Sequence, residues 1–249
     1  MFEDIRTIAR REVKKVLADK ATLLISVIWP LFIIFIIGLG FDSFIEFKGL
    51  ETTYLAFLGP GIIALMAMGG ATYVGNTMIN ERATFIKELL VAPISRVSIF
   101  IGKIIGAMAI DFVIITIVSM IFLEAIGALS IMSVVWTLIF MFLIEFVFYG
   151  LSLLMGVFFS RPGTYQQIGG ILSFVIISLS GAFFPVANLP IFMKIVSYIN
   201  PLTYGVDGLR GQLIGVSMFP AAFNIFMLLA FGIATSLLGA FFFRRFLEA

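Results

Sequence analysis

The chain has 249 residues, of which 61% are hydrophobic and only 12% are charged, whereas an average soluble domain carries about 25% charged residues. A packed interior cannot absorb this much apolar surface, so the composition excludes a soluble globular domain. The sequence contains no cysteine and no histidine, which excludes disulfide, thiolate and histidine-dependent catalytic chemistry.

The first predicted element is an amphipathic helix over residues 4–20. Arginine and lysine side chains surround an apolar stripe at helical spacing, formed by Ile5, Ile8, Ala9, Val13, Val16 and Leu17. This pattern is typical of a helix that lies in the membrane surface with its basic face toward anionic headgroups. The next apolar run is too long for a cleavable signal peptide. The interfacial helix either only anchors the topology or also transmits motion.

Six apolar segments follow, each near the length of about 20 residues that a bilayer-spanning helix needs. They are Thr22–Phe41, Tyr54–Val74, Ser98–Leu123, Val134–Phe159, Ile168–Phe184 and Pro220–Phe243. Thirteen of the sixteen basic residues lie on one side of the predicted spans. Because cytoplasmic segments carry the excess of lysine and arginine, both termini are predicted to be cytoplasmic. We expect one multi-pass domain over residues 1–249 in the cell (plasma) membrane.

A polar segment separates the second and third spans at residues 80–93. Asn80 can cap a short helix and Pro93 ends it. Two pairs of apolar residues lie one turn apart between them: Phe85 with Leu89, and Ile86 with Leu90. So short a helix is marginal in water. It therefore needs a docking surface, either the cytoplasmic end of its own bundle or a separate soluble protein.

Two carboxylates are predicted inside the membrane. Asp111 follows about ten residues of the third span and Glu145 about eleven of the fourth, so at about 1.5 Å per residue both lie roughly 15–17 Å deep. Ionised groups at this depth are costly and mark functional candidates. They either form a polar pair that holds the bundle together, with at least one member protonated, or line a path for substrate or cation.

The segment between the last two predicted spans, residues 185–215, mixes apolar and polar residues. Pro190 suits a first helical position, and Asn200-Pro201 separates two short helices. These helices either re-enter the membrane, where protein or a water-filled cavity must cover their backbone, or lie in the headgroup layer.

The run "NERATFIKELLVAPISRVSIFIGK" resembles the first cytoplasmic loop of type-2 ABC transporter permeases, the membrane subunits of drug, lipid, polysaccharide and sodium exporters. The matching positions are Glu81, Arg82, Thr84, Glu88, Leu89, Leu90, Pro93, Gly102 and Lys103. The residues of "ARREVKKVLADKATLLISVIWPLFIIFIIGLGF" resemble the family's elbow helix and first span. "SGAFFPVANLP" and "INPLTYGVDGLRG" resemble its external segment. This chain departs from the pattern at Ala83, where many members have glycine, and at Phe85-Ile86, where some carry a more polar pair.

The resemblance implies an all-α integral membrane fold with six transmembrane helices. It adds an amphipathic elbow helix over residues 1–21, a cytoplasmic coupling helix over 80–93, and short external re-entrant helices over 185–215. The coupling helix would fit a cleft on a separate ATPase subunit through Glu81, Arg82, Thr84, Phe85, Ile86, Glu88, Leu89, Leu90 and Pro93. An external gate would be formed by Pro185, Asn200, Pro201, Tyr204, Asp207 and Arg210. Two copies, expected as a homodimer, would form the translocation path for a hydrophobic drug-like or lipid-like compound.

The sequence contains no phosphate-binding loop of the form G-x-x-x-x-G-K-[ST]. We therefore expect no enzymatic activity and no cofactor in this chain, with ATP and Mg²⁺ bound by the partner ATPase. The expected partners are membrane lipids, cytoplasmic ABC ATPase subunits, a second copy and the transported substrate, but no nucleic acid. Two rival classes stay open: a self-contained secondary transporter or channel that uses Asp111 and Glu145, and a membrane enzyme limited to carboxylate chemistry.

Overall fold

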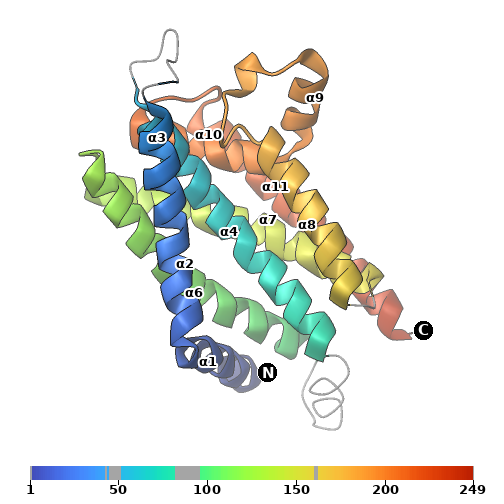
Figure 1. The fold of residues 1–249 in the computed structure, drawn as a ribbon. Helices are drawn as coiled ribbons and strands as arrows, with labels where there is room; N and C mark the ends of the chain where they lie inside the picture. The colour runs from blue at the N-terminus through green and yellow to red at the C-terminus, as the bar shows by residue number, and fades with distance from the viewer. Residues whose placement is uncertain (1, 43, 45–51, 82–95, 160–161, 249) are drawn as a thin grey trace.

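The structure is a computed structural model that describes residues 2–42, 44, 52–81, 96–159 and 162–248. Within these ranges the chain is helical and contains no strand. The predicted interfacial helix corresponds to α1 (Phe2–Ala18), which lies across one end of the helix bundle (Figure 1). Both chain termini are at this end, which we call the terminal end; the opposite one is the distal end.

The first predicted span is confirmed as a continuous helical segment, Lys20–Asp42, but it is not a regular α-helix throughout. It comprises α2 (Lys20–Phe32), the π-helical segment η1 (Ile33–Ile37) and α3 (Gly38–Asp42). Asp19 caps α2, because its carboxylate accepts hydrogen bonds from the backbone N–H and the hydroxyl of Thr22. Pro30 lies inside α2, and a proline there removes a backbone donor and crowds the preceding turn. The wider π-helical turns follow directly after it.

Four more long helices form the bundle: α4 (Tyr54–Glu81), α6 (Arg96–Ala125), α7 (Ile131–Phe158) and α11 (Ala221–Glu248). Together with Lys20–Asp42 they give five helices, among the described residues, that are long and apolar enough to cross a membrane. The central helix is α7, which packs against α4, α10 and α11. Large apolar side chains cover the outside of α2, α6 and α11, for example Ile28, Val113 and Phe226. So much exposed apolar surface is what a lipid-facing bundle requires.

The predicted fifth span, residues 168–184, is only partly helical. The helix there is α8 (Pro162–Leu179), whose apolar part, Gly163–Leu179, is shorter than the other spans. The chain turns at Ser180, whose hydroxyl donates to the carbonyl of Ile177, and Gly181 adopts a φ of 81°, which glycine tolerates without steric cost. The described residues therefore support five membrane-spanning helices and one shorter apolar helix, not six full spans.

The segment 185–215 contains two short helices at the distal end (Figure 1). The 3-10 turn η2 (Val186–Asn188) precedes α9 (Ile191–Ile199), and α10 (Pro201–Ile214) follows. The two helices differ in burial: α9 exposes Ile191, Ile195 and Ile199, whereas α10 is buried from Leu202 to Arg210. Asn200 caps α10 by accepting from the N–H of Leu202, and Gly215 ends it in the left-handed region with a φ of 73°.

Candidate functional site

The carboxylate Asp111 lies in the middle of α6 and is held by two other helices. The hydroxyl of Tyr149, on α7, donates a hydrogen bond to Asp111 Oδ2 at 3.0 Å. Gly70, on α4, provides the space for this carboxylate, because a Cβ atom at position 70 would overlap Asp111 Oδ2. The site therefore depends on the close approach of α4, α6 and α7.

The second predicted carboxylate, Glu145, is completely buried on α7. Neither of its oxygens has a hydrogen-bond partner among the described residues. Glu145 and Tyr149 are four residues apart, so both lie on the same face of α7. The structure thus gives Asp111 a tyrosine partner rather than a direct hydrogen bond to Glu145. In the sequence, Tyr149 follows Glu145 by one helical turn, and this spacing could have identified Tyr149 as a possible partner of Asp111.

A cavity of about 540 Å³ opens beside Asp111, between α2, α4 and α6. Its lining begins at the corner between α1 and α2, where Lys15 and Asp19 lie, and extends to Asp111 at mid-helix. The hydrogen bonds from Thr22 favour the charged form of the Asp19 carboxylate and hold its pKa below the usual value. Between these ends the wall is largely apolar and includes Trp29 and Ile114. Asp111 therefore both joins helices and faces a space of ligand size.

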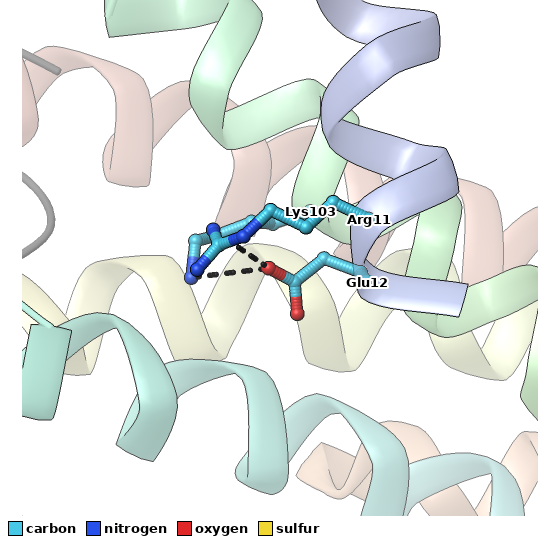
Figure 2. A network of polar contacts seen from close by, with 3 residues as sticks. All are labelled: Arg11, Glu12 and Lys103. Atoms are coloured by element: carbon cyan, nitrogen blue, oxygen red, sulfur yellow. Dashed lines mark ion pairs between the residues drawn. The ribbon is translucent and has the colours of Figure 1, made fainter. Parts of the chain in front are cut away.

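A second charged cluster joins α1 to the first turns of α6. Glu12 Oε1 lies 3.7 Å from Arg11 Nη1 and 3.7 Å from Lys103 Nζ, and Figure 2 shows both basic side chains directed at this one oxygen. Glu12 and Lys103 are 6% and 2% exposed, so this ion pair is shielded from solvent.

Two glycines let α1 approach α6 closely. A Cβ atom at Gly102 would lie 2.8 Å from Ile8 Cβ, and one at Gly106 would lie 2.8 Å from the Ala9 carbonyl oxygen. The spacing Gly102-x-x-x-Gly106 permits close helix packing, and its partner here is α1. Helix α1 is therefore packed against α6 and joined to it by a buried ion pair.

Replacing Lys103 with methionine should lower the free energy of unfolding by about 1–3 kcal/mol, because Glu12 stays buried and, among the described residues, keeps only the exposed Arg11 as an ion-pair partner. Thermal unfolding of the purified protein in detergent measures the effect. The matched control is Lys14→Met, at an exposed lysine of α1, which should change the unfolding midpoint little. Equal losses in both variants would contradict the assigned role of the pair.

At the distal end, Asp207 connects α10 to the chain that enters α11. Its carboxylate accepts hydrogen bonds from the backbone N–H of Met218 at 2.7 Å and of Phe219 at 3.0 Å. A third bond comes from Asn224 Nδ2 at 2.8 Å. Asp207 is 3% exposed, so these donors replace water around the buried carboxylate.

Arg210, one turn further along α10, connects this helix to α4 and to the end of α8. The guanidinium donates to the carbonyl oxygens of Phe57, Gly181 and Ala182, at distances of 2.9–3.4 Å. It also lies 3.6 Å from the centre of the Phe57 ring, which adds a cation–π interaction. Asp207 and Arg210 thus bind different neighbours, and no sequence signal identified those neighbours.

Two other predicted gate residues, Asn200 and Tyr204, also make hydrogen bonds within this end. Asn200 Nδ2 donates to the carbonyl of Ile176 at 2.6 Å, and the Tyr204 hydroxyl donates to the carbonyl of Tyr198 at 2.6 Å. Pro185 precedes η2, and Pro201 is the first residue of α10. Of the six residues proposed as an external gate, Asn200, Tyr204, Asp207 and Arg210 therefore make side-chain hydrogen bonds within the distal end.

The predicted coupling helix spans residues 80–93, and its residues 82–93 lie outside the described residues. Its first two expected residues, Asn80 and Glu81, belong to α4, which continues through Glu81. The predicted helix start at Asn80 is therefore not observed. The contacts expected of Arg82 to Pro93 stay a prediction.

Comparison with known proteins gives a consistent result along most of the chain. Residues 3–214 match the sequence pattern of the family described as ABC-2 type transporter. The transport permease ycf38 of Pyropia yezoensis is 28% identical over 216 residues, covering 84% of this chain and 74% of its own length. The inner membrane transport permease YadH of Escherichia coli K12 is 26% identical over 205 residues, covering 73% of this chain and 72% of its own. YbhR of the same organism, named a probable multidrug ABC transporter permease, is 30% identical over 162 residues, covering 62% of this chain and 42% of its own.

Proposed function

Because the chain belongs to the ABC-2 type transporter family, we propose that it is the membrane permease subunit of an ATP-driven exporter. The family match over residues 3–214 carries the proposal. The five long apolar helices provide the membrane domain that such a subunit needs. Its substrate would be a hydrophobic drug-like or lipid-like compound, and two copies would form the translocation path.

In this proposal the ATPase is a separate cytoplasmic subunit, which docks on residues 80–93. The sequence of this segment supports the assignment, since Phe85, Ile86, Leu89 and Leu90 provide an apolar docking surface beside the charged residues Glu81, Arg82 and Glu88. Lysine and arginine are concentrated on this side of the chain, which favours cytoplasmic termini. The segment leads directly into α6, so movement of a docked ATPase would act on the helix that carries Asp111.

Co-purification with an ATPase tests this function. An ATPase with a phosphate-binding loop, from the same organism, should be retained on the tagged permease. Glu88→Lys should remove most of it, because reversing a charge in a docked interface costs several kcal/mol. The control is Glu124→Lys, at an exposed position near the other end of α6, which should leave the pairing unchanged. Loss of the ATPase in both variants, or none retained by the unaltered chain, would contradict the proposal.

The rival function, a self-contained transporter, has one specific observation in its favour. Glu145 is buried without a hydrogen-bond partner among the described residues, as a group that exchanges protons or cations would be. Reconstituted vesicles separate the two functions. Under our proposal, substrate movement requires the ATPase subunit and ATP, whereas a secondary transporter or channel would move substrate in response to an ion gradient alone.

A further inference from the structure

The cavity beside Asp111 has a chemical character that points to one class of ligand. Its charged lining residues are Lys15, Asp19 and Asp111. Lys15 and Asp19 are exposed at the corner of α1 and α2, whereas Asp111 lies in the middle of α6. The inner part of the cavity therefore has a carboxylate as its charged group.

One oxygen of this carboxylate is already used and the other is not. Asp111 Oδ2 accepts the hydrogen bond from Tyr149 and fits against Gly70. No described residue donates a hydrogen bond to Asp111 Oδ1. A bound cation can pair with this free oxygen, and its charge offsets the cost of keeping a carboxylate in an apolar surrounding.

The remaining polar groups of the wall do not compete for a ligand. The hydroxyl of Thr22 donates to Asp19, and the hydroxyl of Ser26 donates to the carbonyl of Thr22. Apolar side chains complete the lining, including Ile25, Ile110 and Ile114. Trp29 also lines the cavity and is 59% exposed, so its indole ring offers a large aromatic surface to the apolar part of a ligand.

From these groups we propose that the cavity between α2, α4 and α6 binds a monocationic amphiphile, with its cationic group at Asp111 and its apolar body along Trp29 and the isoleucines. The cavity volume of about 540 Å³ lies within the range of sites for drug-sized ligands. An anionic ligand would meet Asp111 without a compensating cation in the inner part. Transport of this ligand rests on the proposed function. Its binding to the cavity does not depend on that function.

The test uses a pair of ions with the same shape and opposite charge. The purified full-length permease, in detergent and without any ATPase, is dialysed against radiolabelled tetraphenylphosphonium. Saturable binding is expected, and tetraphenylborate should not compete for it. Asp111→Asn should weaken phosphonium binding by about tenfold or more, because the charge is lost while an oxygen remains to accept from Tyr149. Glu124→Gln, the control carboxylate on α6, should bind as the unaltered protein does.

A second variant is needed because Asp111→Asn would also lose binding if it failed to fold. Trp29→Leu changes an exposed wall residue and should weaken phosphonium binding several-fold, because the indole no longer packs against the phenyl rings of the ligand. Non-saturable uptake would mean partition into detergent, and equal saturable binding by all variants would mean a site elsewhere in the protein; either result would overturn the proposal. If the phosphonium ion binds but no ATPase co-purifies, the proposed function fails and this inference stands. If the ATPase co-purifies but the phosphonium ion does not bind, only this inference fails.

Discussion

Replacing Arg210 with methionine should destabilise the distal end of the protein by about 3–5 kcal/mol. The substitution removes every hydrogen bond that the guanidinium donates to Phe57, Gly181 and Ala182. These carbonyls lie where water cannot easily replace the lost donor, since Arg210 is 6% exposed. It also removes a positive charge that acts on the buried carboxylate of Asp207. Thermal unfolding, combined with hydrogen exchange of the α10 amides, measures the loss.

Two further variants identify the cause of this loss. Arg210→Lys keeps the charge but not the planar set of donors that reaches several carbonyls at once, so it should recover only part of the stability. Lys194→Met, on the neighbouring helix α9, removes a cation from a half-exposed position and should have little effect. If Arg210→Met and Lys194→Met behave alike, Arg210 does not connect α10 to α4 as the structure indicates.

The second large effect is expected at Gly70, where valine should cost about 2–4 kcal/mol through overpacking and the lost hydrogen bond. A side chain at this position would overlap the Asp111 carboxylate, which must then move away from Tyr149. Because the displaced carboxylate no longer lies where the cavity places it, phosphonium binding should fall together with the unfolding midpoint.

The neighbouring residue provides a matched control for this change. Gly69 also lines the cavity, but a Cβ atom there would have nothing within 4 Å. Gly69→Val should therefore leave stability within about 1 kcal/mol of the unaltered protein and keep the bond between Asp111 and Tyr149. A loss in Gly69→Val as large as that in Gly70→Val would show that added bulk in α4, not the contact with Asp111, is responsible.

The elements that the sequence predicted well are those set by the length of an apolar run. Lys20–Asp42, α4, α6, α7 and α11 match five predicted spans, because bilayer thickness dictates helix length whatever the packing. The fifth predicted span was wrong at its distal end, where α8 stops at Leu179. Hydropathy continues through Phe184, but the hydroxyl of Ser180 and the positive φ of Gly181 end the helix.

The partners of the site residues depend on how the helices are rotated against one another, which one sequence does not determine. Asp111 and Glu145 were correctly identified as groups at mid-helix, yet Tyr149 is the residue that bonds Asp111. Lys103 was noted as part of a family motif, whereas its ion pair with Glu12 requires α1 to pack on α6. Arg210 donates its hydrogen bonds to backbone carbonyls. Because every residue has a backbone carbonyl, no sequence pattern indicates which ones Arg210 binds.

The interruption of α2 after Pro30 has a consequence for the cavity beside Asp111. A proline inside a helix has already removed one backbone hydrogen bond, and the π-helical turns of Ile33–Ile37 accommodate the irregularity. Trp29 and Pro30 line the cavity directly before this point. We therefore expect this segment to bend more easily than a regular α-helix, and such bending would change the width of the cavity. The wall of the cavity that carries Trp29 is thus formed by an irregular helix.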